Sequence, residues 1–583
     1  MISQLIVDRH LPVPMRDGTL LRADVYRPQV DYPVPAILCR LPYNKDDLRM
    51  FFEAIHPVLA AEAGYAVVFQ DTRGRFRSDG DFYPFVYEGP DGYDTVEWVA
   101  QQAWCDGAIG MVGASYFGAT QWLAAVENPP HLRALFPLVT ASEYYEGWSY
   151  QGGAFQLGFL LYWALGFASD TGQRLASSGA VSQEDIQRIE AALDDLGSQH
   201  YRELPLSSLS ILKQTGVADY YFDWLAHDTN DDYWQRTAIN RRYSQIEVPA
   251  FNVGGWYDLF LHGTIENFTR MRVEGGSQAA RQGQRLLIGP WAHGNFGGVF
   301  PAQDFGVGAS MDSVDLTSIQ LRYFDQHLRN ISADNGGEAP VRIFVMNENR
   351  WRDENEWPLD RTEYTPWYLH SGGTANSTGG TLSPQHPSQQ PADVYLYDPR
   401  RPVPTVGGST LLTGLRIGKN AGPHDQRPVE TRDDVLVYSS DPLDEPLEVT
   451  GPLVFKLWAA SSAVDTDFVV RLCDVWPDGT SMLLAEGIVR AKYRNGCLKA
   501  SLITPGEVYE YQIDLVATST VFRAGHRIRI VVTSSSWPRF DVNCNSGKPL
   551  GTDEPQDMLP ALQTVFHDAD RPSQIVLPII PIR

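Results

Sequence analysis

Cysteine is scarce in this sequence, with five residues among 583, and the five are widely scattered along the chain. It contains no Cys-x-x-Cys motif and no two histidines separated by three residues, the spacings that often mark zinc ligands. We therefore expect reduced, mostly buried thiols, no metal site and no cofactor.

Long hydrophobic runs are also missing. No stretch of about 18 consecutive apolar residues is present, and the sequence does not start with a basic segment followed by an apolar one. These absences exclude a membrane-spanning helix and a recognisable secretory signal. The expectation is a soluble, cytoplasmic protein that does not bind membranes.

Positive charge is in deficit, because 47 Lys and Arg stand against 71 Asp and Glu, giving a formal net charge of −24. Such an acidic balance disfavours nucleic acid and anionic membrane surfaces as partners. We therefore expect the protein to bind a small molecule, and self-association into a homo-oligomer is compatible with this composition. Hydrophobic residues make up 43% of the chain, and its length predicts two to four domains.

The sequence Gly-Ala-Ser-Tyr-Phe-Gly at 113–118 joins an apolar strand pattern at 108–112 to a helical pattern at 119–126. A serine on a sharp turn between strand and helix is typical of the nucleophile elbow of α/β-hydrolases. Ser115 is therefore the predicted nucleophile. The usual elbow is Gly-x-Ser-x-Gly, and here Phe117 takes the place of the second glycine. The alternative is a glycine-rich turn with an incidental serine.

The order of the elements predicts the fold class. Strand and helix patterns alternate up to residue 141, after an antiparallel start in residues 1–35, and strands resume at 248–254 and 285–289. This alternation predicts a mostly parallel sheet covered on both faces, built from 1–141 and 246–350. Residues 142–245 read as a helical insertion, or cap. After about residue 350 short alternating strands dominate, so 351–583 are predicted to form a β-sandwich.

A serine hydroxyl needs a base to take its proton and a carboxylate to orient that base. In α/β-hydrolases these residues follow the serine in the order acid, then histidine, each just past the end of a strand. Asp258 ends the segment Gly-Gly-Trp-Tyr-Asp, and His293 ends Gly-Pro-Trp-Ala-His. The rivals are His262, which lies inside a helix pattern, and Asp71, which precedes the elbow. For Asp71 a structural ion pair with Arg73 or Arg75 is the favoured interpretation.

An oxyanion hole needs two donors. One is the backbone N–H of Tyr116, directly after the nucleophile. The other belongs to the loop after an early strand, here 40–46, which has no glycine to offer a backbone donor. Tyr43 in this loop carries an O–H group, and the alternative is a tyrosine that only packs beneath the loop.

Together these motifs resemble the family that joins bacterial cocaine esterase, α-amino-acid ester hydrolases and X-Pro dipeptidyl-peptidases. The resemblance runs through 42–43, 70–74, 104–107, 113–118, 255–258, 289–293, 463–468 and 534–540. It accounts for Phe117, since the elbow of this family is Gly-x-Ser-Tyr-x-Gly. It implies an α/β-hydrolase domain with an inserted helical cap, a C-terminal jelly roll, and a tyrosine hydroxyl in the oxyanion hole.

The resemblance also implies an aromatic acyl pocket. Trp148 and Trp163 in the cap match residues that line this pocket in the esterase branch, and Phe260 matches an aromatic residue after the catalytic acid. The jelly roll of that branch offers an aromatic side chain over the pocket, where this chain has Leu412 and Thr413.

The predicted function is therefore that of a serine carboxylesterase that hydrolyses aromatic acyl esters through an acyl-enzyme. One alternative is an α-amino-acid ester hydrolase or X-Pro dipeptidyl-peptidase, which would need acidic groups for a substrate ammonium. Glu143 and Glu146, at the start of the cap, are the candidates for that role. A more distant alternative is a non-catalytic binding protein that uses the β-sandwich.

Overall fold

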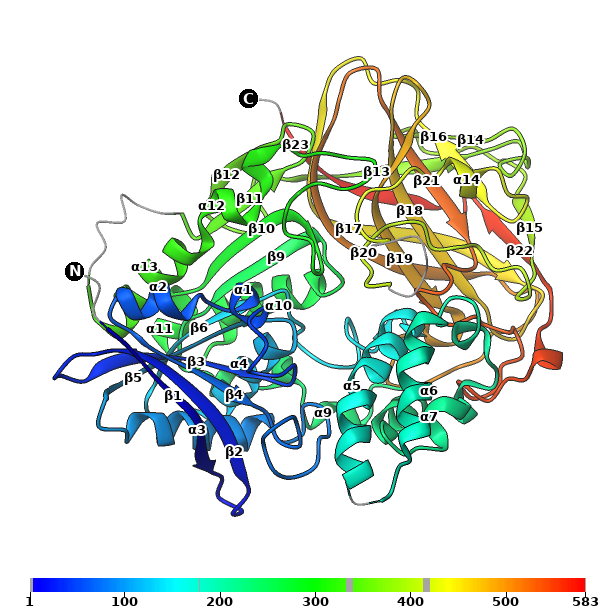
Figure 1. Ribbon diagram of the computed structural model, residues 1–583. Helices are drawn as coiled ribbons and strands as arrows, with labels where there is room; N and C mark the ends of the chain where they lie inside the picture. Colours follow the sequence, from blue (N-terminus) through cyan, green and yellow to red (C-terminus); the bar gives the residue numbers. More distant parts are fainter. Residues whose placement is uncertain (1–3, 178, 332–338, 413–419, 582–583) are drawn as a thin grey trace.

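The computed structural model describes residues 4–177, 179–331, 339–412 and 420–581. Two large β-structures dominate it, and a group of helices stands beside both (Figure 1). The blue and green strands of the N-terminal half form one sheet, and the yellow to red strands of the C-terminal half form the other structure. The cyan helices between them in sequence are the cap.

Ten described strands form the first sheet in the spatial order β1-β2-β4-β3-β5-β6-β9-β10-β11-β12. The strands are β1 (Leu5–Pro14), β2 (Leu20–Pro28), β3 (Val34–Leu41), β4 (Ala66–Asp71), β5 (Cys105–Ala114), β6 (Leu132–Leu138), β9 (Phe251–Tyr257), β10 (Arg285–Ala292), β11 (Val341–Val345) and β12 (Arg350–Glu354). All pairs from β4 to β11 are parallel, and the pairs at both edges are antiparallel. Because parallel strands point the same way, the residues that follow β3, β5, β9 and β10 gather at one edge of the sheet.

Helices cover both faces of this sheet. The apolar side chains of β3 alternate, so that Leu38 joins a core with α3 (Glu88–Ala100) and α4 (Tyr116–Val126), while Ile37 and Cys39 join another with α2 (Pro57–Glu62) and α13 (Leu316–Leu328). Burial on both faces explains why β3 and β4 read as continuous apolar runs. The remaining helices of this half are α1 (Met50–Glu53), α10 (Leu261–Glu274), α11 (Gln278–Gln282) and α12 (Met311–Val314).

The segment 46–63, which the sequence pattern predicts as one helix, is two helices in the structure. α1 ends at Glu53, and α2 begins at Pro57. A proline lacks a backbone N–H and disfavours helical geometry in the residue before it, so His56 is extended, with φ −71° and ψ 110°. Glu53, the last residue before this break, lines the cavity described below.

The cap lies between β6 and β9 in sequence. Its longest helix is α5 (Leu157–Ser177), followed by α6 (Gln183–Asp194), α7 (Ser210–Lys213), α8 (Asp219–Ala226) and α9 (Asp232–Gln235). A two-strand hairpin of β7 (Tyr150–Gln151) and β8 (Ala154–Phe155) precedes α5. The sequence pattern over 224–243 predicts another helix of the cap. The structure has a series of short helices and turns there, because α8 ends at Ala226 and a new N-cap forms at Asp231.

The C-terminal half is a β-sandwich of eleven described strands. They are β13 (Glu363–His370), β14 (Gly380–Ser383), β15 (Asp393–Tyr397), β16 (Leu436–Ser439), β17 (Leu447–Ser461), β18 (Asp467–Val475), β19 (Ser481–Arg490), β20 (Tyr509–Phe522), β21 (Arg527–Thr533), β22 (Ala561–Phe566) and β23 (Gln574–Ile580); a short helix, α14 (Arg427–Glu430), lies between β15 and β16. Their inward side chains share one apolar core. The predicted fold class, an α/β-hydrolase domain with a helical cap and an all-β sandwich, is confirmed.

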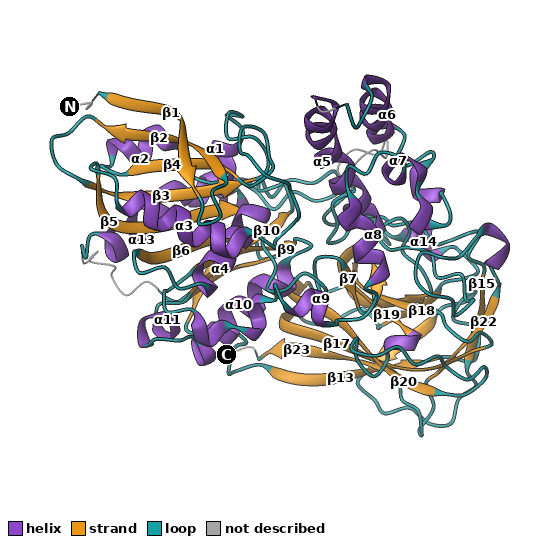
Figure 2. Ribbon diagram, turned by 90° about the horizontal axis from the view of Figure 1, so that it is seen from below, coloured by secondary structure: helices purple, strands orange, loops and turns teal. Residues whose placement is uncertain are grey.

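The sandwich is joined to the first sheet by direct contacts. Met346 pairs with Thr520 in a parallel bridge, and the Arg352 guanidinium lies 2.7 Å from the Glu448 carboxylate. β12 continues the first sheet to Glu354, a little beyond residue 350. Figure 2 shows the cap helices beside the sandwich strands β18 and β19, with the first sheet on the other side. No helix in the described part of the chain is both long and apolar enough to cross a bilayer.

Candidate active site

Ser115 stands at the junction of β5 and α4 with a left-handed backbone, φ 55° and ψ −122°. The turn is tight because two glycines allow close approach. A Cβ on Gly113 would lie 2.4 Å from the Phe117 ring, and one on Gly118 would lie 2.7 Å from the Thr140 side chain. The hydroxyl of Thr140 donates to the carbonyl of Ser115 at 2.8 Å, which helps to hold the unusual conformation. This geometry is that of a nucleophile elbow.

The structure brings together Ser115, Asp258 and His293. Asp258 follows β9 and His293 follows β10, at the same sheet edge as the elbow. The Nε2 atom of His293 lies 3.0 Å from Ser115 Oγ, and its Nδ1 atom lies 2.8 Å from Asp258 Oδ2. The other carboxylate oxygen of Asp258 accepts the N–H of Phe260 at 2.7 Å. The carboxylate is thus buried and held, so it fixes the tautomer and orientation of the imidazole.

Neither rival residue takes part in this chain of hydrogen bonds. His262 faces Asp514 of the sandwich, with Nδ1 3.5 Å from the carboxylate. Asp71 accepts the backbone N–H groups of Lys45, at 2.8 Å, and Arg77, at 3.4 Å. Burial raises the pKa of Asp71 to about 7.

The ion pair predicted between Asp71 and Arg73 or Arg75 is absent among the described residues. The Arg73 guanidinium is bound to Asp91 and Asp17 instead. That of Arg75 donates to the backbone carbonyl of Pro42 at 3.0 Å. Asp71 therefore binds backbone N–H groups of the segments after β3 and β4.

Tyr43 lies in the loop after β3, and its ring packs against Phe117 and Phe167, with centroids 5.9 and 5.2 Å away. Its hydroxyl oxygen accepts the indole N–H of Trp163 at 3.1 Å. Burial raises the pKa of Tyr43, and the hydrogen bond from Trp163 only partly offsets this. The phenol therefore keeps its proton and can donate a hydrogen bond into the cavity that it lines together with Ser115. Tyr116 is the first residue of α4, where backbone N–H groups have no acceptor within the helix.

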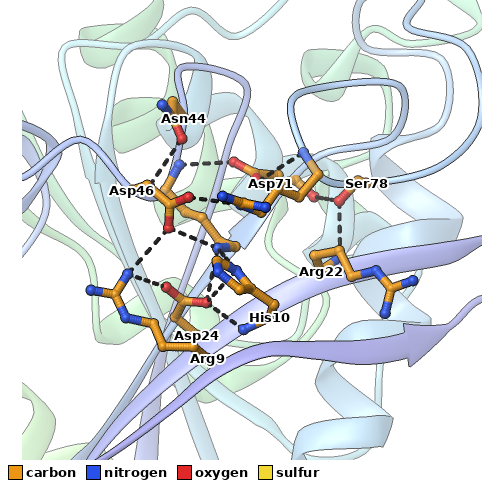
Figure 3. A network of polar contacts seen from close by, with 10 residues as sticks. Arg9, His10, Arg22, Asp24, Asn44, Asp46, Asp71 and Ser78 are labelled. Atoms are coloured by element: carbon orange, nitrogen blue, oxygen red, sulfur yellow. Dashed lines mark hydrogen bonds and ion pairs between the residues drawn. The ribbon is translucent and has the colours of Figure 1, made fainter.

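A polar network, which includes His10, Asp24, Asp46 and Asp71 (Figure 3), holds the backbone directly after Tyr43. The Lys45 ammonium lies 2.8 Å from Asp24, 3.0 Å from Asp46 and 2.8 Å from the His10 ring, while its backbone N–H binds Asp71. His10, Asp24 and Asp46 stand close enough together to hold a metal ion. The lysine ammonium already supplies the positive charge there, so we interpret the cluster as an internal ion network that stiffens the loop.

A cavity of about 510 Å³ opens in front of Ser115 and His293. Its walls come from several parts of the chain. The cap helix α5 contributes an aromatic wall of Phe159, Tyr162, Trp163 and Phe167. The segment after β3 contributes Asp47, Arg49, Met50 and Glu53, of which three are charged. Phe296, after His293, and Leu411, from the C-terminal half, complete this part of the lining.

Only one of the four predicted acyl-pocket residues, Trp163, lines this cavity. Trp148 and Phe260 are fully buried and stack on one another, with ring centroids 4.4 Å apart. Leu412 is also buried, packed so closely on Gly158 that a Cβ there would approach its side chain to 2.1 Å. Its neighbour Leu411 faces the cavity instead. Thr413 lies outside the described residues.

Apart from Trp163, Tyr43, Ser115 and His293, sequence reasoning did not predict the residues of this cavity, although a signal for some of them was present. Phe159 and Phe167 lie four residues before and after Trp163, so all three share one face of α5. Helical spacing alone would have extended the predicted aromatic wall in both directions. Glu53 carried no comparable signal, because its position depends on the break between α1 and α2.

The proposed ammonium-binding residues of the alternative function lie elsewhere. Glu143 accepts a hydrogen bond from the Asn230 amide at 3.0 Å, and Glu146 accepts the N–H of Gly152 at 3.1 Å. Neither lines the cavity in front of Ser115. The cavity contains two carboxylates, Asp47 and Glu53, among its lining residues. Asp47 is bound to Arg49, whereas Glu53 accepts no hydrogen bond from the described residues.

Comparison with known proteins gives one consistent family. Residues 17–295 match the model of the X-Pro dipeptidyl-peptidase S15 family, and residues 335–576 match the X-Pro dipeptidyl-peptidase C-terminal non-catalytic domain. The chain is 40% identical to cocaine esterase from Rhodococcus sp. (strain MB1 Bresler), over 98% of both chains.

Solved structures agree with these matches. An α-amino-acid ester hydrolase shares 25% identity and a TM-score of 0.80, over 99% of this chain and 97% of the other. An aminopeptidase from the marine sediment archaeon Thaumarchaeota archaeon shares the fold, with a TM-score of 0.81 and 24% identity over 100% and 97% of the two chains. The chain therefore belongs to the S15 family of X-Pro dipeptidyl-peptidases and their esterase relatives, the family that its sequence motifs resemble.

Proposed function

We propose that this protein is a serine carboxylesterase that hydrolyses esters of aromatic acids through an acyl-enzyme. The observation that carries the proposal is the hydrogen-bonded chain from Ser115 through His293 to Asp258 at the floor of a cavity with an aromatic wall. Aromatic side chains bury a flat apolar group well, which favours an aryl acyl moiety beside Ser115.

In the proposed mechanism, His293 takes the proton of Ser115 as its oxygen attacks the ester carbonyl. Asp258 keeps the imidazole oriented and stabilises its positive charge. The O–H of Tyr43 and the N–H of Tyr116 hold the oxyanion of the tetrahedral intermediate. His293 then returns the proton to the departing alcohol. A water molecule, deprotonated by the same histidine, attacks the acyl-enzyme and releases the acid and the free serine.

Pre-steady-state kinetics would test the acyl-enzyme. With a p-nitrophenyl ester of an aromatic acid, the proposal expects a burst of about one nitrophenol per active site when deacylation is slower than acylation. Mass spectrometry of the quenched enzyme should place the acyl group on Ser115. Acylation at another residue would contradict the mechanism.

The aromatic wall predicts a substrate preference. p-Nitrophenyl benzoate should show a higher kcat/KM than p-nitrophenyl acetate, because the benzoyl ring contacts α5. The Phe159→Ala variant should reduce this preference about three- to tenfold, the size of one lost aromatic contact. Leu412→Ala serves as the control, since Leu412 is buried beside the cavity without lining it. An equal loss of preference in both variants would move the acyl site away from this wall.

Glu53 suggests what the alcohol part of the ester carries. Its carboxylate lines the same cavity as His293, the residue that protonates the leaving alcohol. The nearby Arg49 is bound to Asp47, and the described residues offer Glu53 no hydrogen bond. A protonated amine on the alcohol would satisfy this carboxylate through a charge-assisted hydrogen bond.

Dimethylaminoethyl benzoate should therefore have a higher kcat/KM than the isosteric 3-methylbutyl benzoate. Glu53→Gln should lower the ratio of the two kcat/KM values about tenfold, equivalent to about 1.4 kcal/mol. Burial raises the pKa of Glu53. Since only the ionised form attracts the amine, the preference should be lost as the pH falls through this raised pKa and grow as the pH rises above it. A ratio unchanged by the substitution at every pH would exclude Glu53 from recognition.

A further inference from the structure

One hydrogen bond at the active site crosses from the cap to the hydrolase domain. The indole Nε1 of Trp163, on cap helix α5, lies 3.1 Å from the hydroxyl oxygen of Tyr43, in the loop after β3. An indole N–H can only donate, so it occupies a lone pair of the phenol oxygen. The single hydrogen of Tyr43 must therefore point away from Trp163. Tyr43 and Ser115 line the same cavity, so this hydrogen can be directed to the space beside the nucleophile.

The ring of Tyr43 is clamped by the same helix. Phe167 lies one turn after Trp163, so both side chains project from one face of α5. The Phe167 ring centroid is 5.2 Å from Tyr43 and 4.1 Å from Trp163, while Phe117 contacts Tyr43 from the elbow side. With its ring enclosed between these partners, Tyr43 has little freedom except rotation of its hydroxyl.

The backbone on both sides is also joined. The buried guanidinium of Arg75 donates to the carbonyl of Pro42 at 3.0 Å and to that of Phe167 at 3.2 Å. It therefore ties the residue before Tyr43 to the cap helix. The loop and the helix are thus held at a fixed separation, which the hydrogen bond between Trp163 and Tyr43 requires.

Building on the function proposed above, we infer that Trp163 is a positioning residue of the oxyanion hole, and that cap helix α5 completes this hole by directing the Tyr43 hydroxyl towards the carbonyl oxygen of the substrate. A donor stabilises a developing oxyanion best when it does not have to reorient as charge appears. Trp163 removes the competing orientations by occupying the oxygen lone pair. Its main effect is on the transition state, beyond any contact its ring makes with the acyl group.

The chain offers a matched control in Trp148. This second cap tryptophan lies in the same aromatic cluster, with its ring centroid 6.2 Å from that of Trp163. Its indole N–H is buried and has no hydrogen-bond partner among the described residues. Tryptophan to phenylalanine at both positions therefore removes an indole, but only at Trp163 does it remove a hydrogen bond to Tyr43.

The test measures kcat and KM for p-nitrophenyl acetate and p-nitrophenyl benzoate. Trp163→Phe should lower kcat about three- to tenfold with both esters and change KM little, since one ordinary hydrogen bond is lost from the positioning of the donor. A residue that only lines the acyl pocket would instead change the ratio between the two esters. Trp163→Met is the second variant should the phenylalanine protein prove unstable in thermal unfolding.

A double-mutant cycle with Tyr43→Phe gives the decisive readout. Without the Tyr43 hydroxyl there is nothing for the indole to orient, so Trp163→Phe should have little further effect on kcat in that background. Trp148→Phe should have the same effect in both backgrounds. If Trp163→Phe multiplies the loss of Tyr43→Phe in full, the two residues act independently and the inference is wrong.

The outcomes also separate this inference from the proposed function. Absence of esterase activity in the wild type, or its survival in Ser115→Ala, would overturn the function itself. In the other case the wild type is active and depends on Ser115 and Tyr43, while the effects of Trp163→Phe and Tyr43→Phe on kcat are independent of each other. That result would overturn only the role of the cap helix.

Discussion

Replacing Ser115 by alanine is expected to lower kcat for ester hydrolysis by about 10⁶-fold, the loss seen when the nucleophile of a serine hydrolase is removed. The fold should survive, because Ser115 lines a cavity and its hydroxyl is hydrogen-bonded to His293 within the site. Steady-state assays with p-nitrophenyl benzoate would measure the loss of kcat, and thermal unfolding would show whether the fold is retained.

His293→Ala should cost a similar factor, and the double variant should lose little more, because the serine is inactive without its base. Ser149→Ala is a matched control, since Ser149 is buried and its hydroxyl has no hydrogen-bond partner among the described residues. It should retain most of the wild-type kcat. Residual activity within tenfold of wild type in Ser115→Ala would refute the assignment of the nucleophile.

Tyr43→Phe should lower kcat by about 10² to 10³, or about 2.7–4 kcal/mol, the usual cost of one oxyanion-hole donor. The substitution keeps the ring, so its contacts with Phe117 and Phe167 remain. KM should change little, because the lost interaction belongs to the transition state. Inhibition by phenylboronic acid, which forms a tetrahedral adduct with the serine, should weaken in parallel with kcat.

The control for Tyr43→Phe is Tyr162→Phe, which removes the hydroxyl of another tyrosine in the same cavity. Tyr162→Phe should have a far smaller effect on kcat. Among the described residues, the Tyr162 hydroxyl makes no hydrogen bond that would link it to the oxyanion hole. A Tyr43→Phe enzyme within threefold of wild type would return Tyr43 to a packing role. A backbone N–H would then have to supply the second donor.

The sequence alone predicted Ser115, Asp258 and His293 at one sheet edge, where the structure brings them within hydrogen-bonding distance. This was possible because their positions depend on local patterns. Each follows a short apolar strand, and the direction of a parallel sheet brings the ends of such strands together whatever the details of packing. The elbow glycines and the loop that carries Tyr43 are likewise encoded by neighbouring residues. The two helices in 46–63 could also have been predicted, because Pro57 marks the break.

Tertiary structure decided which side chains of equal local character line the cavity in front of Ser115. Trp148 and Trp163 are both apolar cap residues, yet one stacks on Phe260 in the core and the other reaches Tyr43 and the cavity. Leu411 and Leu412 are adjacent, and only Leu411 lines the site. These choices depend on how the cap and the sandwich pack against the hydrolase domain. Such contacts join segments that are far apart in the chain, so no local period or motif can specify them.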